Sequence, residues 1–175
     1  MCGIVGYVGE KQAANFLIDG LTKLEYRGYD SAGIAVFDGE KINVAKSVGR
    51  LAALKEKIKN NTPEGVMGIG HTRWATHGRP SDVNSHPHTD CSGKFAIVHN
   101  GIIENFMSLK EELIAKGHKF VSETDTEVVA HLIEDVYEGD FVEAVNKVLN
   151  RIEGSYSLAF MCQDYPDTLI CTKKD

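Results

Sequence analysis

MCGIVGYVG, residues 1–9, places a cysteine directly behind the initiator methionine and an apolar run directly behind the cysteine. Residues 4–8 predict a buried strand, so Cys2 would stand at the start of that strand. If Met1 is removed, Cys2 carries both a thiol and a free α-amine. Their usual pKa values are about 8.5 and about 8, so near neutral pH the amine can accept the thiol proton, directly or through one water. Cys2 is therefore a candidate nucleophile; the alternative is a small apolar residue that merely begins a strand.

The rest of the chain shows both helical and strand periodicity. Helices are predicted at residues 12–24, 51–58, 103–115, 124–137 and 141–149, and further strands at 33–37, 42–47, 66–71, 95–99, 156–161 and 168–171. Asp38-Gly39 and residues 164–167 predict hairpin turns, and residues 124–127 predict a capping box. Strands at both ends and in the middle, with helices between them, predict an α+β layered protein with mostly antiparallel sheets.

Composition narrows the class of protein and of partner. A chain of 175 residues suits one domain, and its formal net charge of -6, without any basic run, disfavours nucleic acid and anionic membranes as partners. No signal-peptide pattern and no long apolar segment are present, so no membrane span and a cytoplasmic location are expected. The four cysteines show no CxxC pairing and are expected to be free thiols.

A long polar passage, residues 72–93, shows almost no periodicity, and a loop of that length inside a compact domain usually binds something. Arg73 is a candidate for gripping a carboxylate, because a planar guanidinium can donate two parallel hydrogen bonds; the alternative is a solvated surface arginine. The same passage contains Trp74, Thr76 and His77. The HPH at residues 86–88 raises the question of a metal, but no HExxH or Cys/His pairing completes a site, so no metal is expected.

VHNGIIEN, residues 98–105, places Asn100 and Gly101 between an apolar strand and a predicted helix. An asparagine amide and the next backbone N–H can both donate to one oxygen, so this pair is a candidate oxyanion hole; an ordinary Asn-Gly turn is the alternative. Asp125, in ETDTE, either holds an ammonium group or only begins a helix. LEYRGYDSAG, residues 24–33, predicts a helix C-cap with Gly28 in the left-handed region.

Taken together, these segments resemble the N-terminal glutaminase domain of class II glutamine amidotransferases, which are N-terminal nucleophile (Ntn) hydrolases. CGIVGY is similar to the class signature. LEYRGYDSAG, HTRWATHG, NSHPH, HNGIIEN and SETDTE, in this order, are similar to the members that convert fructose 6-phosphate to glucosamine 6-phosphate. The resemblance covers essentially the whole chain and implies a four-layer αββα sandwich of two mostly antiparallel sheets, with Cys2 opening a central strand.

The resemblance also implies a role for each candidate. Cys2 would attack the side-chain amide of L-glutamine, and no metal or organic cofactor is called for. Asn100 and Gly101 would hold the oxyanion, Arg73 the α-carboxylate and Asp125 the α-ammonium group. Trp74, Thr76 and His77 belong to the segment 73–80 that would close over glutamine, and His86 would lie near the site.

In that family, ammonia passes to further synthase and isomerase domains of a longer chain, which is expected to be a homo-oligomer. No such sequence follows here, and the chain ends in KKD without a turn signal. Residues 1–175 are therefore expected to be a glutaminase domain cut short at its C-terminal end. Two alternatives stay open. One is the glutaminase domain of another class II amidotransferase, of the phosphoribosyl-diphosphate or asparagine-forming type. The other is a non-catalytic glutamine-binding module in which a retained Met1 blocks the amine of Cys2.

Overall fold

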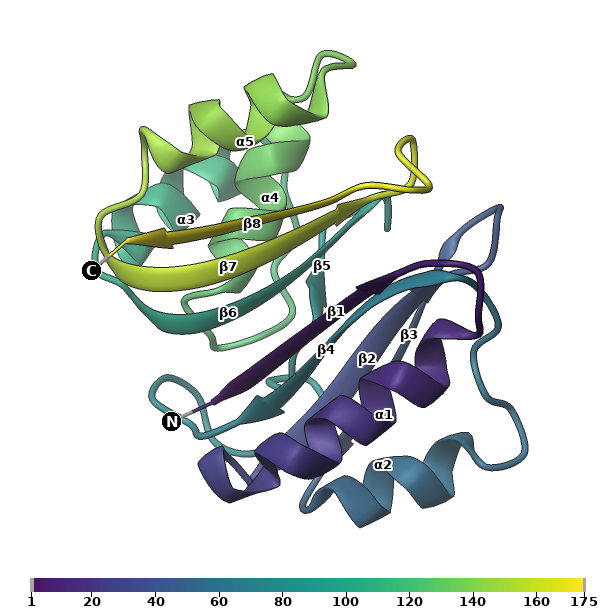
Figure 1. Ribbon diagram of the computed structural model, residues 1–175. Coiled ribbons are helices and arrows are strands. Elements are labelled where there is room, and N and C mark those ends of the chain that lie inside the picture. Colours follow the sequence, from purple (N-terminus) through teal and green to yellow (C-terminus); the bar gives the residue numbers. More distant parts are fainter. Residues whose placement is uncertain (1, 175) are drawn as a thin grey trace.

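The computed structural model describes residues 2–174, which form two four-stranded antiparallel sheets covered by helices (Figure 1). The N-terminal sheet has the order β1-β4-β2-β3 and the C-terminal sheet the order β5-β6-β7-β8. The strands are β1 (Gly3–Val8), β2 (Ser31–Phe37), β3 (Ile42–Val48), β4 (Met67–Arg73), β5 (His88–Thr89), β6 (Phe95–Ile103), β7 (Gly154–Cys162) and β8 (Leu169–Lys174). The helices are α1 (Ala13–Leu24), the 3-10 helix η1 (Glu25–Arg27), α2 (Leu51–Ile58), α3 (Phe106–Ala115), α4 (Glu127–Val136) and α5 (Phe141–Leu149).

The elements stack as four layers (Figure 1). Helices α1 and α2 cover the outer face of the N-terminal sheet, while α3, α4 and α5 cover the outer face of the C-terminal sheet. The two sheets meet through buried apolar side chains, among them Ala35, Met67 and Ile69 on one side and Ala96 and Met161 on the other. The predicted α+β sandwich of two antiparallel sheets in four layers is confirmed. The expectation that Cys2 opens a central strand was wrong, because β1 is an edge strand of its sheet in the part of the chain that the structure describes.

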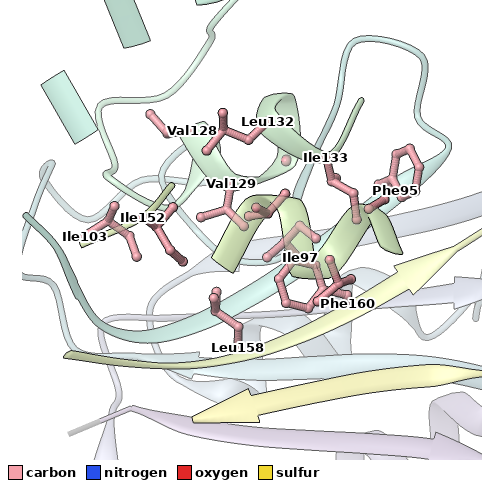
Figure 2. Close-up of a cluster of buried hydrophobic side chains, with 14 of the residues drawn as sticks. Phe95, Ile97, Ile103, Val128, Val129, Leu132, Ile133, Ile152, Leu158 and Phe160 are labelled. Carbon is pink, nitrogen blue, oxygen red and sulfur yellow. The ribbon is translucent and has the colours of Figure 1, made fainter. Parts of the chain in front are cut away.

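Helix α4 is deeply buried against the C-terminal sheet. Val128, Val129, Leu132 and Ile133 lie on its buried surface and belong to the cluster that packs against β6 and β7 (Figure 2). Fully burying one such side chain stabilises the fold by about 1.5–3 kcal/mol. The segment that leads into α4 is therefore attached to a firmly anchored element.

Strands β4 and β6 extend beyond their predicted ends in a way that affects the site. Strand β4 continues through Arg73, which pairs with Ser31 of β2, so Arg73 ends a strand instead of lying in a loop. Strand β6 continues through Ile103, which pairs with Gly154, and the helix predicted from residue 103 begins only at Phe106. Pairing with β7 supplies backbone partners all along residues 95–103, and this outweighs the local helical pattern.

The predicted start of α4 was wrong as well. The helix begins at Glu127, and instead of closing a capping box the Glu127 carboxylate accepts hydrogen bonds from the amides of Val121 and Ser122, at 2.9 and 2.7 Å. Thr124, the expected cap, instead hydrogen-bonds through Oγ1 to Nε2 of His88 at 3.0 Å. Residues 121–126 thus form an irregular lead-in that is held by side chains.

Gly28 does not adopt the predicted left-handed conformation, since its φ is -164°. Glycine is needed at this position because the backbone of Arg73 leaves no room for a side chain: a Cβ here would lie 2.7 Å from the carbonyl group of Arg73. The hairpins predicted at Asp38-Gly39 and at residues 164–167 are confirmed by the β2–β3 and β7–β8 pairings. Within residues 2–174, no helix has both the length and the apolar character needed to cross a bilayer.

Candidate active site

Strand register brings the beginning of the chain to the end of β4. Gly3 pairs with Thr72, so Cys2 lies beside the last residues of β4, and β6 of the other sheet passes over the same point. A cavity of about 680 Å³ opens there. Every site residue predicted from the sequence lines it: Cys2, Arg73, Trp74, Thr76, His77, His86, Asn100, Gly101 and Asp125.

The thiol of Cys2 is held by the backbone of Trp74. Trp74 N donates to Sγ at 3.1 Å, and the thiol in turn can donate to Trp74 O at 3.5 Å. Burial raises the pKa of the Cys2 thiol, while the hydrogen bond from Trp74 N opposes that shift. The thiol is therefore protonated near neutral pH and needs a base before it can attack. Met1, whose removal would free the α-amine, lies outside the described residues.

The amide of Asn100 is oriented from both ends. Its Nδ2 donates to the carbonyl of Cys2 at 3.0 Å, and its Oδ1 accepts from Nε2 of His71 at 2.8 Å. The same His71 nitrogen lies 2.9 Å from the carbonyl oxygen of His99. Because both of its partners are acceptors, Nε2 of His71 carries the proton. The NH₂ group of Asn100 consequently faces Cys2.

Gly101 follows Asn100 within strand β6, so the alternative of an ordinary Asn-Gly turn is wrong. The two residues pair with Tyr156 and Ser157 of β7. Gly101 has a φ of +123°, and a Cβ there would lie 2.1 Å from the carbonyl oxygen of Ser155. Only glycine fits this close approach of two backbones.

Arg73 is buried, which excludes the solvated surface arginine considered from the sequence: only 3% of it is exposed. Its Nη2 donates to the carbonyl oxygens of His77 and Gly78, the latter at 2.9 Å. Within residues 2–174, Nη1 has no hydrogen-bond partner. A buried guanidinium nitrogen without a partner is costly, and in a residue that lines a cavity it marks a place for an anion.

Asp125 brings the opposite charge to the same cavity. It is 4% exposed, and its Oδ2 accepts from the amide of Ile103 at 2.8 Å and lies 4.0 Å from Nδ1 of His99. Asp125 precedes α4 in the irregular lead-in and does not begin the helix itself. The cavity therefore offers a buried cationic and a buried anionic group, as recognition of a zwitterionic α-amino acid requires.

His86 belongs to a group of stacked and hydrogen-bonded histidines. Its ring stacks on that of His71 with centroids 4.2 Å apart, and its Nδ1 accepts from the amide of His99 at 3.3 Å. Burial lowers the pKa of both His71 and His99 to about 4, and that of His86 and His88 well below its usual value. These rings are neutral at physiological pH.

Two residues with a part in this geometry were not singled out from the sequence as site residues. His71 holds the Asn100 amide, and Oδ2 of Asp30 accepts a hydrogen bond from the amide of Ala75, in the loop that follows β4. The available signal for His71 was a histidine inside an apolar strand, where an imidazole needs a partner. Trp74 in the same loop is half-exposed and packs edge-to-face on Tyr29.

Known proteins share both the sequence and the fold. The pattern of the family described as "Glutamine amidotransferase domain" matches residues 71–174. Over all 175 residues the chain is 60% identical to glutamine--fructose-6-phosphate aminotransferase [isomerizing] of Caldanaerobacter subterraneus subsp. tengcongensis. The protein with that name from Thermococcus kodakarensis is 54% identical over 177 aligned residues. The chain spans 29% of the length of each of these two curated relatives and is fully covered by both.

Among solved structures, glutamine phosphoribosylpyrophosphate amidotransferase from B. subtilis, complexed with ADP and GMP, superposes with a TM-score of 0.80 at 30% identity. That match covers 93% of this chain and 35% of that one. The four-layer sandwich is therefore of the Ntn hydrolase type. Because it matches the family pattern and is closely similar to these relatives, the chain belongs to the glutamine amidotransferase family.

Proposed function

We propose that residues 1–175 form a glutaminase domain that hydrolyses L-glutamine to glutamate and ammonia. The observation that carries the proposal is a single cavity lined by a thiol, an unpartnered buried guanidinium nitrogen and a buried carboxylate. Arg73 would bind the α-carboxylate of glutamine and Asp125 its α-ammonium group. Bound in this way, glutamine would direct its side-chain amide toward Cys2. The family membership supports the choice of glutamine among amino acids.

The reaction follows from the groups around Cys2. After removal of Met1, the α-amine of Cys2 takes the thiol proton, and the thiolate attacks the side-chain amide carbon. The C=O electron pair moves onto oxygen, where the Asn100 amide and the Gly101 N–H stabilise the charge. The α-ammonium returns its proton to the departing nitrogen, and ammonia leaves behind a γ-glutamyl thioester. Water, deprotonated by the same amine, attacks the thioester and releases glutamate.

Four further residues that line the cavity would support this reaction. Trp74, Thr76 and His77 would enclose glutamine, while His86 acts as a positioning residue by bracing the rings and backbone that hold Asn100 in place. No step in the scheme needs a metal or an organic cofactor.

The longer relatives suggest where the ammonia goes. Because the matching proteins are named for fructose 6-phosphate and the chain spans 29% of them, we propose that further synthase and isomerase domains aminate this sugar phosphate in a homo-oligomer. The phosphoribosyl-diphosphate type remains the competing enzyme, given its structural match. An assay of the longer protein with each of the two acceptors would decide between them.

Substitution of the nucleophile tests the proposal. Cys2→Ala should lower glutamine turnover by at least roughly 10⁴-fold, because the covalent route disappears. The matched control is Cys171→Ser, since Cys171 is a free, exposed cysteine on β8, and it should keep parental activity. Intact mass measured on the same samples should show loss of one methionine from the active chain. Substantial turnover by Cys2→Ala, or by a chain that retains Met1, would contradict the mechanism; a retained Met1 with glutamine binding but no turnover would favour the binding module.

A further inference from the structure

A second cluster of reactive side chains lies outside the glutamine cavity. Sγ of Cys91, the imidazoles of His118 and His131 and the carboxylate of Glu134 offer atoms that all lie within 4.8 Å of one another. They come from three places in the fold: the β5–β6 turn, the segment after α3, and α4. None of the four lines the cavity that contains Cys2.

The distances from Nδ1 of His131 to the sulfur and carboxylate atoms of the cluster match those between ligands of one metal ion. Cys91 Sγ lies 3.6 Å from Nδ1 of His131, and Oε2 of Glu134 lies 3.5 Å from that nitrogen and 3.0 Å from Nδ1 of His118. Zn–S bonds of about 2.3 Å and Zn–N or Zn–O bonds of about 2.0–2.2 Å place tetrahedral ligand atoms roughly 3.3–3.6 Å apart. Both histidines present the same nitrogen, Nδ1, to the centre of the cluster.

Outside the cluster, each histidine has a carboxylate behind it. Nε2 of His131 lies 3.4 Å from Oε1 of Glu127, and Nε2 of His118 lies 3.7 Å from Oδ1 of Asp135. A carboxylate on the far nitrogen is the usual support of a metal-bound imidazole, because it fixes the tautomer and the ring orientation. The amide of Lys119 donates to Sγ of Cys91 at 3.4 Å.

We propose that Cys91, His118, His131 and Glu134 bind one Zn²⁺ ion in a four-coordinate structural site. A mixed set of sulfur, nitrogen and oxygen ligands suits zinc better than Mg²⁺ or Ca²⁺, which prefer oxygen. His131 is fully buried, while Cys91 is exposed, so the ion has a route in from solvent.

The bound ion would stabilise the segment that carries Asp125. His131 contacts Glu127, whose carboxylate also accepts the amides of Val121 and Ser122 at the beginning of the lead-in to α4. Zinc would therefore join α3, α4 and the β5–β6 turn around that lead-in. A metal-free cluster is the competing explanation, because the contact of His118 with Glu134 at 3.0 Å is also a normal hydrogen bond.

Co²⁺ provides a direct probe of the ligand set. The full 175-residue chain, freed of metal with a chelator, is titrated with Co²⁺, and Zn²⁺ is then added in competition. One equivalent of Co²⁺ should produce a thiolate-to-metal charge-transfer band and the visible bands of four-coordinate cobalt. Zn²⁺ should abolish these bands and raise the melting temperature in a concentration-dependent manner.

Variants assign the bands to this cluster. Cys91→Ser should remove the charge-transfer band and weaken Zn²⁺ binding at least 100-fold, since loss of outer-sphere partners alone costs about 10–100-fold. Glu134→Gln should keep the band but weaken binding. Cys171→Ser and Cys2→Ala should both behave like the parent chain in this titration. Absence of the band in the folded parent chain, or a band that survives Cys91→Ser, would overturn the proposal. Neither result bears on glutamine hydrolysis, which is measured separately.

Discussion

The two terminal nitrogens of the Arg73 guanidinium have different surroundings. Its Nη2 fixes the loop after β4 through the carbonyls of His77 and Gly78, and this leaves Nη1 buried without a partner. Such a group costs about 1–3 kcal/mol, or more when it is charged. A bound carboxylate would supply the missing partner and remove this cost.

Arg73→Lys tests this point while keeping the positive charge. A single ammonium cannot replace the planar fork that holds two loop carbonyls and also grips a carboxylate. We expect kcat/KM for glutamine to fall at least tenfold, mainly through KM, while Cys2 stays open to alkylation by a small reagent. Steady-state kinetics and the alkylation rate measure the two effects.

Arg79→Lys is the matched control, because Arg79 is an exposed arginine in the same loop. It should leave both quantities near the parental values. If Arg73→Lys also keeps the parental kcat/KM, Arg73 has no part in substrate binding.

At this scale the sequence predicted the identities of the residues better than their environments. Cys2, Arg73 and Asn100 were found from local motifs, and all of them line one cavity. The orientation of the Asn100 amide was not predictable, because it depends on His71 from a strand of the other sheet. In the proposed zinc site, His131 and Glu134 are neighbours on α4, but Cys91 and His118 come from other segments. Only the packing of the β5–β6 turn and of the segment after α3 against α4 brings the four together.

Strand β6 is the element in which local pattern and tertiary structure disagree most. Asn100-Gly101 has the local signature of a turn, and the residues that follow look helical. Pairing with β7 nevertheless keeps the strand extended to Ile103. Close backbone approaches at Gly101 and Gly154 make this possible, since a Cβ at either glycine would lie within 2.2 Å of a carbonyl oxygen on the opposite strand. Such long-range pairings are not visible in a short window of sequence.

Gly101→Ala measures what that approach requires. The new methyl group would collide with Ser155 and push β6 away from β7, displacing the proposed oxyanion donors. Gly39→Ala is the matched control: Gly39 also has a positive φ, of +102°, but a Cβ there meets nothing within 4 Å. Backbone strain alone should cost Gly39→Ala about 1–2 kcal/mol of unfolding free energy.

The steric clash should cost Gly101→Ala at least about 2 kcal/mol more, within the range seen for overpacking. Its glutamine turnover should be lost, whereas that of Gly39→Ala should persist. Urea unfolding and a glutaminase assay supply the two measurements. Equal stability of the two variants would show that β6 can move without cost.

Across the whole molecule, the space between the sheets is divided into an apolar part and a polar part. The apolar part is the core around Ile69 and Val98. The polar part contains His71 of β4, which stacks on His86 and hydrogen-bonds to the backbone of His99 on β6. The layered α+β architecture could be predicted from periodicity, but the four layers were predicted only from the family resemblance. Strand order depends on which sheet faces pack together, and periodicity carries no information about that.

Neutral histidines between the sheets make the stability of the fold depend on pH. Burial lowers the pKa of His71 and His99 from 6.5 to about 4 in the folded state. Between these values the unfolded chain binds more protons than the folded chain, so stability is complete above about pH 6.5 and is lost as the pH falls toward 4. The full shift corresponds to roughly 3 kcal/mol for each of these two histidines.

Urea unfolding from pH 8 to pH 4.5 should therefore show a steep decrease in unfolding free energy that begins near pH 6.5. His71→Gln keeps a hydrogen-bond donor for Asn100 but cannot titrate. The change of its unfolding free energy with pH between 4.5 and 6.5 should therefore correspond to the uptake of one proton fewer on unfolding. A slope unchanged in His71→Gln would show that His71 takes up no proton on unfolding and is already charged in the folded protein.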